Sequence, residues 1–134
     1  MADTPTLHVC ITCRTGQPLE EGETAPGQHM FDAVAAALAV GRPGVELRAV
    51  QCLSSCDHGC AAAISSPGKW TYLLGRLEPS LVADLLAYAD SYARAATGTV
   101  LPSRRPASLG RMILGRMPDL TRIEVAATRL EATA

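Results

Sequence analysis

The stretch VQCLSSCDHGC, residues 50–60, carries three cysteines at intervals of four residues, Cys52, Cys56 and Cys60. The run before it, VELRAVQC at 45–52, alternates apolar and polar side chains, which predicts a strand that ends at Cys52. The three thiols therefore lie in a loop just beyond a strand end. They are so close in sequence that they must share one small volume.

A second cysteine pair lies upstream. The run TLHVCIT, residues 6–12, also alternates and predicts a strand that delivers Cys10 and Cys13 to its end. The first four cysteines thus read C-x2-C, 38 residues, then C-x3-C. Since both pairs are expected in loops at strand ends, their side chains can converge on one inorganic centre.

The rest of the chain supplies the elements of an α/β domain. The Gly, Pro and Glu-rich run 14–28 predicts a loop, and apolar residues at helical spacing predict a helix over 30–40. The runs 61–65 and 70–77 flank the turn SPGK and predict a hairpin, and a second helix is expected from Pro79 to about residue 96. The predicted order is β-α-β-β-β-α, in a mixed sheet.

Length and composition bound the class of protein. The chain has 134 residues, of which 48% are hydrophobic, as expected for one domain with one core. The start lacks a secretory signal, and the apolar run at 33–40 is too short to span a bilayer, so a soluble cytoplasmic protein is expected. In a reducing compartment, 5 cysteines indicate metal ligation or thiol chemistry rather than structural disulfides.

Charge divides the chain in two. Residues 1–96 carry six basic and ten acidic side chains, a net charge of −4, whereas residues 97–134 carry six arginines and three acids, a net charge of +3. Because the body is acidic, nucleic-acid binding is not expected. We predict a domain at 5–96 and an Arg-rich C-terminal extension at 97–134 that packs on the body or on a partner.

The extension carries the linker LPSRRP and the near-repeat LGRM-I-LGRM. Residues 121–124 offer a capping box for a short helix, although the apolar residues at 123 and 125 also suit a strand, and the choice stays open. Its arginines 104, 105, 111 and 116 either dock an acidic partner or the acidic body of a second subunit, or are simply solvated.

The five thiols admit three kinds of chemistry. Iron–sulfur clusters need four thiolate donors, tetrahedral zinc sites use similar spacings, and C-x2-C also resembles a thiol-disulfide redox motif. Spacing alone does not separate iron from zinc. The redox motif needs a helix N-terminus beside its nucleophile, and here Arg14 and a loop follow Cys13, so none is expected there.

The stretch VQCLSSCDHGCAAAISSPGKWTYLLGRLEPSLVADLL resembles the second half of the thioredoxin-like 2Fe-2S ferredoxins, which include a subunit of respiratory complex I. Those proteins carry a strand, C-L-G-A-C, an Ala-Pro, a hairpin and a helix. Cys52, Leu53 and Cys56 match that motif, and Cys60 falls at the family's proline. The resemblance implies the thioredoxin-like ferredoxin fold with a 2Fe-2S cluster, and it places Cys60 near the cluster.

The whole chain also resembles a small bacterial family of predicted metal-binding proteins. The segments that carry this resemblance are VCITCR, CLSSCDHGC, GKWTYLLG and LPSRRPASLGRMILGRMP. That family is often associated with cobalamin-biosynthesis genes, which implies a link to cobalt or corrin metabolism.

Together these observations predict a 2Fe-2S electron carrier, not an enzyme, with Cys10, Cys13, Cys52 and Cys56 as ligands. Cys60 is expected as an alternate ligand or a redox-active thiol. The partner is a redox protein rather than a nucleic acid or a membrane, and a homodimer is an open expectation. The alternatives are a zinc- or cobalt-binding module that handles metal, and a thiol-disulfide oxidoreductase that uses Cys10 and Cys13.

His58 is a further candidate ligand, because histidine replaces cysteine at some irons, or it tunes the potential of a cluster by hydrogen bonding. An ordinary, partly exposed loop residue is the competing interpretation.

Overall fold

The fold is taken from a computed structural model that describes residues 4–14, 18–40, 44–54 and 58–119. Cys56, Asp57 and the segment 121–124 lie outside these residues. The order of helices and longer strands is β1 (Thr6–Cys10), α1 (Pro26–Ala39), β2 (Glu46–Val50), β3 (Ala62–Ser65), β4 (Thr71–Leu74), α2 (Val82–Arg94) and β5 (Ile113–Met117). The predicted β-α-β-β-β-α order is confirmed, and β5 is an additional strand.

The strands form one mixed five-stranded sheet in the order β2-β1-β3-β4-β5. Strands β1 and β2 are parallel, because α1 carries the chain back between them, and the remaining neighbours are antiparallel. Leu7 and Val9 are fully buried, whereas Thr6 and His8 on the other face are partly exposed. This alternation is the period-2 pattern from which the strand was predicted.

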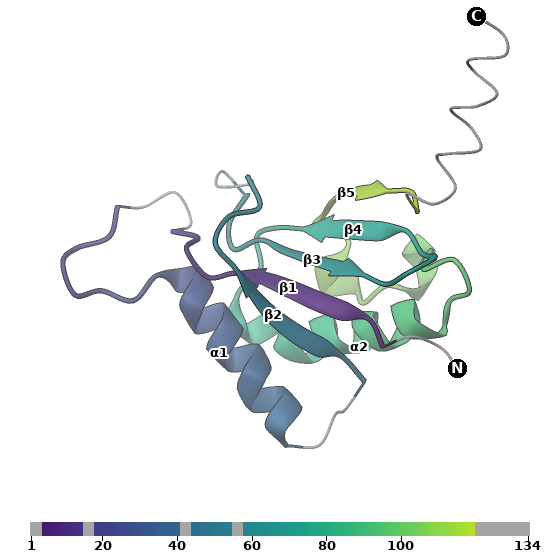
Figure 1. Ribbon diagram of the computed structural model, residues 1–134, viewed down its shortest axis with the longest axis horizontal. Helices are drawn as coiled ribbons and strands as arrows, with labels where there is room; N and C mark the ends of the chain where they lie inside the picture. The colour runs from purple at the N-terminus through teal and green to yellow at the C-terminus, as the bar shows by residue number, and fades with distance from the viewer. Residues whose placement is uncertain (1–3, 15–17, 41–43, 55–57, 120–134) are drawn as a thin grey trace, which may run out of the picture.

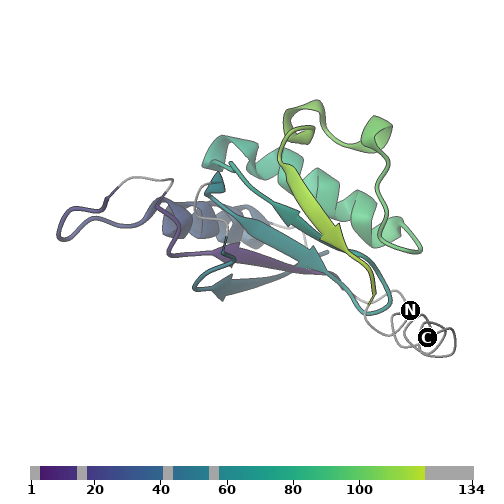
Figure 2. The same cartoon turned by 90° about the horizontal axis from the view of Figure 1, so that it is seen from above.

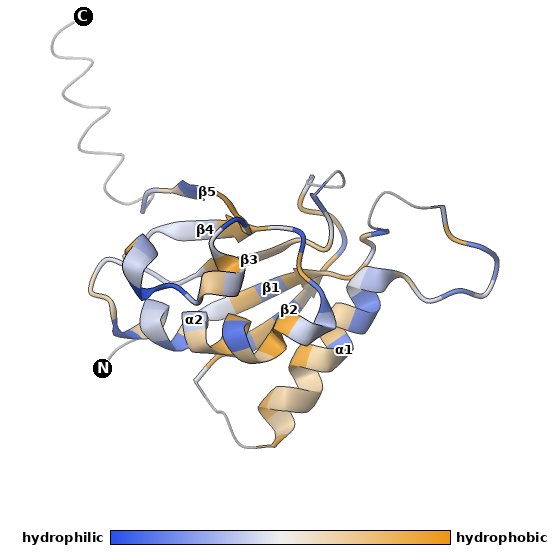
Figure 3. Ribbon diagram, turned by 180° about the vertical axis from the view of Figure 1, so that it is seen from behind, coloured by the Kyte–Doolittle hydropathy of each residue, from blue (hydrophilic) through white to orange (hydrophobic). Residues whose placement is uncertain are grey.

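Both helices cover the same face of the sheet (Figures 1 and 2). Helix α1 packs on β1 and β2 and also contacts α2. Helix α2 turns an apolar stripe to the core, in which Leu85, Tyr88 and Tyr92 are buried. In Figure 3 hydrophobic residues run through parts of β1, β2 and β3 behind the helices, and much of the loop before α1 is hydrophilic. No helix in the described residues is long and apolar enough to cross a membrane.

Helix α1 begins at Pro26, four residues before the start predicted at Met30. Proline suits the first position of a helix, since it has a fixed φ and lacks an N–H that the helix would leave unpaired there. Gly27, which was assigned to the loop, lies buried in the first turn. The correction matters for the site, because it brings the start of α1 against the first cysteine pair.

The predicted hairpin is confirmed as β3 and β4. Its turn contains Gly68 at a positive φ of 77°, and the Lys69 N–H closes the turn by donating to the Ser66 carbonyl at 3.1 Å.

The chain after α2 runs beside that helix and returns to the sheet as β5, which pairs antiparallel with β4 (Figure 2). The predicted extended linker is wrong in detail, because short 3-10 turns form at Pro102–Arg104 and Ala107–Leu109. Val100 and Leu109 are buried in the core. The described part of the extension therefore packs on the body, although a domain boundary after residue 96 stays a prediction.

Candidate functional site

Three thiols meet at one end of the sheet. Cys10 is the last residue of β1, and Cys60 comes just before β3, whose chain pairs with β1 through the Cys10 N–H and the Ala61 carbonyl at 3.0 Å. The exposed fractions are 5% for Cys10, 4% for Cys13 and 2% for Cys60. The two strand ends therefore place three cysteines in the core.

Cys10, Cys13 and Cys60 belong to the same cluster of buried side chains. Burial, followed by the influence of Cys13 and then of Cys10, raises the pKa of the Cys60 thiol to about 11. The three thiols thus act on one another, and Cys60 stays protonated at neutral pH in the metal-free protein. This places Cys60 beside the first cysteine pair, in the neighbourhood that the ferredoxin resemblance implies.

The second cysteine segment runs next to the first. Val50 at the end of β2 lies opposite Cys10, and its carbonyl accepts the Ile11 N–H at 2.9 Å. The Cys10 Sγ donates to the Gln51 carbonyl at 3.7 Å, and the Thr12 hydroxyl donates to the same oxygen. Cys52, the next residue, is exposed, and its Sγ accepts the Ser54 N–H at 3.2 Å. The segments 10–13 and 50–52 are therefore neighbours in space.

The first turn of α1 packs directly on the first cysteine pair. The Gly27 N–H donates to the Cys13 carbonyl at 3.0 Å. A Cβ at Gly27 would lie 2.0 Å from the Cys10 carbonyl oxygen and 2.9 Å from the Cys13 nitrogen. Only glycine permits this approach. The sequence signal for this contact is the Pro-Gly pair at 26–27, which by itself is typical of a loop.

The expectation that no helix N-terminus lies beside Cys10 and Cys13 is therefore wrong, because the loop after Arg14 returns the chain to them. The N–H groups of the first turn are nevertheless occupied. Pro26 has none, the Gly27 N–H binds Cys13, and the Gln28 and His29 N–H groups both donate to the Ala25 carbonyl. These donors are bound to carbonyl oxygens and are not directed at a sulfur.

In the described residues, no three Cys, His, Asp or Glu side chains already form a group that could hold a metal ion. The donor chemistry nevertheless fits a thiolate-ligated centre, since Cys10 and Cys13 are buried and the backbone that leads to Cys52 contacts the Cys10 sulfur. Cys56 lies outside the described residues.

The histidines take different positions. His58 is partly exposed, and its carbonyl accepts the Arg76 N–H at 2.5 Å. His8 lies within hydrogen-bond distance of Ser65, with 3.2 Å between Nε2 and Oγ. Burial, and then the nearby Arg48, lowers the pKa of His8. His29 is exposed in the first turn of α1.

A hollow of about 560 Å³ lies beside the thiols. Its lining residues come from the start of α1, from the segment before β3 and from the segment before α2: Pro26, His29, Cys60, Leu77, Glu78 and Pro79. Cys60 is the cysteine among them. The hollow therefore lies against one of the three buried thiols.

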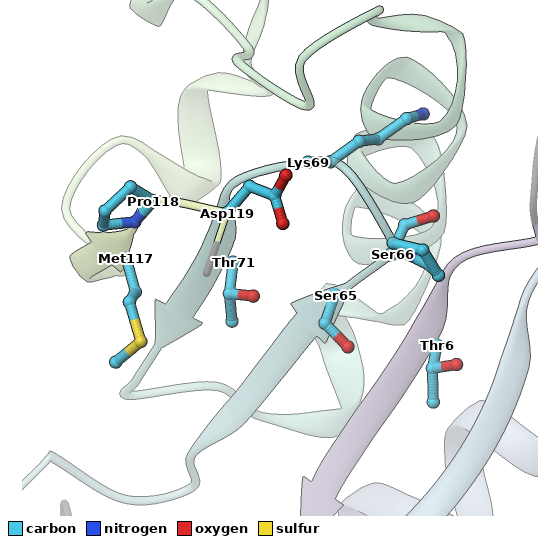
Figure 4. A pocket seen from close by; sticks show the side chains of 9 residues that line it. Thr6, Ser65, Ser66, Lys69, Thr71, Met117, Pro118 and Asp119 are labelled. Carbon is cyan, nitrogen blue, oxygen red and sulfur yellow. The ribbon is translucent and has the colours of Figure 1, made fainter. Parts of the chain in front are cut away.

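A second hollow, of about 310 Å³, lies at the start of β1 rather than at its cysteine end (Figure 4). Hydroxyl side chains of Thr6, Ser65 and Thr71 line it. The Lys69 Nζ is directed to helix α2, where it donates to the Tyr92 carbonyl at 3.2 Å and the Ala93 carbonyl at 2.8 Å. This hollow lies away from the thiols.

The arginines of the extension divide into two groups. The Arg105 Nε donates to the Val100 carbonyl at 2.9 Å, and its guanidinium lies 5.8 Å from the centre of the Tyr72 ring. The Arg116 guanidinium lies 4.0 Å from the centre of the Trp70 ring. Arg104 and Arg111, like Arg116, are exposed. Of the four arginines in the described part of the extension, Arg105 and Arg116 thus contact aromatic rings of the body. Docking of an acidic partner stays a prediction.

Solved structures with a similar fold are those of the thioredoxin-like [2Fe-2S] ferredoxin from Aquifex aeolicus. One has a TM-score of 0.56 at 13% identity and covers 89% of this chain and 98% of that chain. The wild-type ferredoxin at 1.5 Å resolution has a TM-score of 0.54 at 14% identity and covers 85% of this chain and 99% of that chain. The predicted fold is confirmed, and identities this low establish the fold alone.

Sequence comparison identifies the family. No curated protein matches the chain significantly. Residues 7–119 match the family described as "Protein of unknown function (DUF1636)", and the chain belongs to that family. The match spans both cysteine segments and continues through β5.

Proposed function

For this member of the DUF1636 family, we propose the function of a 2Fe-2S electron-transfer protein with a cluster held by Cys10, Cys13, Cys52 and Cys56. The observation that carries the proposal is the contact between the two cysteine segments, in which the Cys10 Sγ donates to Gln51, directly before Cys52. Similarity of fold to thioredoxin-like [2Fe-2S] ferredoxins supports it.

Four thiolates are the donor set that a 2Fe-2S cluster needs, two for each iron. When bound, the cluster would supply a one-electron couple. A cluster with four thiolate ligands has no open position for a substrate, so the chain would pass electrons to a partner rather than catalyse a reaction itself.

Residues around the thiols would affect a bound cluster in three ways. Burial of Cys10 and Cys13 would keep water away from a cluster that they hold. The Ser54 N–H, which donates to the Cys52 Sγ at 3.2 Å, would stabilise negative charge on that sulfur and so raise the reduction potential. The Cys60 side chain, buried in the same cluster as Cys10 and Cys13, would add a further thiol beside the ligands.

Metal and sulfide analysis of anaerobically purified protein tests the proposal. We expect a brown protein with about two irons and two acid-labile sulfides per chain. A colourless protein with one zinc and no sulfide would instead support the metal-handling alternative. A metal-free protein that reduces disulfides, and loses this activity in Cys10→Ser, would support the oxidoreductase.

Single cysteine variants test the ligand set. Cys10→Ser, Cys13→Ser, Cys52→Ser and Cys56→Ser should each lose most of the cluster, because each removes one ligand. Cys60→Ser is the matched control and should retain the cluster with a shifted visible spectrum. Equal loss in Cys60→Ser would show that the ligand set is wrong. The link to corrin metabolism stays a prediction.

A further inference from the structure

We propose that a groove between the end of α2 and the chain that follows it binds a phosphorylated small molecule through its phosphate group. The groove has a volume of about 560 Å³. The chain after α2 runs beside that helix and forms the second wall (Figure 2). Four polar side chains line the groove, two from each wall: Ser91, Arg94, Thr99 and Arg104.

The two arginines supply positive charge from opposite walls. Arg94 is the last residue of α2, and Arg104 is the last residue of the 3-10 turn that follows. Both side chains are exposed, and neither forms a salt bridge within the described residues. The Arg94 Nε donates to the Asp90 carbonyl at 3.4 Å, which leaves the two terminal nitrogens of the guanidinium as further donors. The groove therefore holds positive charge that no acidic side chain of the described residues pairs with.

The Thr99 hydroxyl adds a donor. Its oxygen accepts the Thr97 hydroxyl at 3.3 Å and an Arg116 N–H at 3.5 Å. Because a hydroxyl oxygen that accepts two hydrogen bonds keeps its own proton for a third partner, Thr99 can donate to a ligand. Ser91 supplies a second hydroxyl from the opposite wall. Donors thus reach the groove from both sides, and no carboxylate is among the described residues that line it.

The end of α2 does not oppose an anion here. The last carbonyls of a helix carry partial negative charge, which would repel one. The Lys69 ammonium donates to two of them, the Tyr92 carbonyl at 3.2 Å and the Ala93 carbonyl at 2.8 Å. The Ala95 N–H donates to the Ser91 carbonyl at 3.1 Å. Lys69 therefore offsets the helix dipole with a further positive charge.

The arrangement of donors favours a phosphate over a carboxylate. A carboxylate has two oxygens in one plane, whereas a phosphate group presents three acceptor oxygens and a larger negative charge. Arginine binds phosphate with two parallel hydrogen bonds. Since the guanidinium and hydroxyl donors come from two walls, a tetrahedral group can accept from both at once.

The rest of the lining is apolar and comes from Ala95, Val100 and Leu101. Leu101 is 57% exposed, which makes it one of the large hydrophobic side chains on the surface. A phosphate group between the arginines would leave this apolar wall free for the organic part of a ligand. We therefore expect a phosphate ester, such as a nucleotide, to bind more tightly than inorganic phosphate.

The groove lies apart from the thiols. Pro79, just before α2, lines the hollow beside Cys60, whereas Arg94 lies at the other end of the helix. The 13 residues of α2 span about 20 Å at ~1.5 Å per residue. Binding in the groove is therefore independent of a cluster and goes beyond the proposed function.

Calorimetric titration of the full chain in magnesium-free buffer tests the site, with ADP, pyrophosphate, adenosine and citrate as probes. We expect ADP to bind, pyrophosphate to bind more weakly, and adenosine not to bind. Pyrophosphate that binds as tightly as ADP would support the phosphate site but overturn the part of the apolar wall. Citrate that binds as tightly as ADP, or no binding of either phosphorylated probe, would overturn the proposal.

Charge-removing variants locate the site. Arg94→Gln and Arg104→Gln should each weaken ADP binding at least about tenfold, because hydrogen bonds between charged groups are the strong ones. Arg111→Gln is the matched control, since Arg111 is an exposed arginine of the same extension that does not line the groove. It should keep the wild-type affinity. Equal weakening in Arg111→Gln would show attraction to overall charge and overturn the proposal.

The variant Cys52→Ser separates this site from the proposed function. It should bind ADP with wild-type affinity whether or not it holds iron. Loss of ADP binding in this variant would place the nucleotide at the cysteine end and overturn the proposal. A wild-type protein that binds ADP in the groove but never takes up iron would refute the electron-transfer function and leave the phosphate site standing.

Discussion

The cysteine end of the sheet buries its reactive side chains, whereas the β5 edge holds charged side chains over aromatic rings nearer the surface. At the cysteine end, Cys10, Cys13 and Cys60 are buried next to one another, and main-chain hydrogen bonds hold their segments. At the β5 edge, Arg116 and Arg105 lie over aromatic rings and attach the extension. Reactive groups gather at the first region, whereas the charged groups of the second stabilise the fold.

The largest effect is expected where α1 meets the cysteines. In Gly27→Ala, the new methyl group would overlap the Cys10 carbonyl oxygen, which lies 2.0 Å from the Cβ position. Alanine gains about 1 kcal/mol of helix propensity, but overpacking against main chain costs about 3 kcal/mol or more. We expect a strongly lowered free energy of unfolding in denaturant titrations of the metal-free protein.

The matched control is Gly115→Ala, since no atom lies within 4 Å of its Cβ position. It should unfold at nearly the wild-type denaturant concentration. A Gly27→Ala protein as stable as this control would show that α1 does not pack on the cysteine pair.

A smaller effect on the free energy of unfolding is expected when the buried Cys13 is compared with the exposed Cys52. Cys13→Ala removes a sulfur that is 4% exposed and should lower the free energy of unfolding of the metal-free protein by about 1 to 2 kcal/mol. Cys52→Ala removes an exposed sulfur and should change it by less than about 0.5 kcal/mol. If both variants lost the same free energy of unfolding in thermal or denaturant titrations, Cys13 would not be more buried than Cys52.

The smallest effect is expected at the β5 edge. Arg116→Ala removes a guanidinium 4.0 Å from the Trp70 ring centre and should cost about 0.5 to 1 kcal/mol. Because Trp70 is the single tryptophan, acrylamide quenching of its fluorescence should increase. Arg111→Ala, which removes an exposed arginine of the same extension, should leave quenching unchanged. The same quenching in both variants would argue against the Arg116 contact.

The sequence predicts the fold well where the signal is local. Alternation at Leu7 and Val9 and the Pro-Gly turn at Pro67 and Gly68 fix the strands and the hairpin. Strand β5 was missed, because ILGRM contains a glycine and an arginine and forms an edge strand through its pairing with β4. Pairing between distant segments has no local signature.

The site could be predicted only in outline. Cysteines at two strand ends indicate a shared centre, and the structure brings the segments 10–13 and 50–52 side by side. The contact of Gly27 with Cys10 and Cys13 was not predictable, because a Pro-Gly pair usually marks a turn and only the tertiary approach of main chain to main chain requires glycine there.

Reductive titration of the anaerobically purified protein, followed by electron paramagnetic resonance, tests the central claim most directly. A 2Fe-2S cluster takes up one electron, so we expect about one reducing equivalent per chain and a paramagnetic signal that appears on reduction and disappears on reoxidation. Uptake of two electrons per chain without a paramagnetic signal would indicate a disulfide instead. No uptake at all would contradict the electron-transfer function.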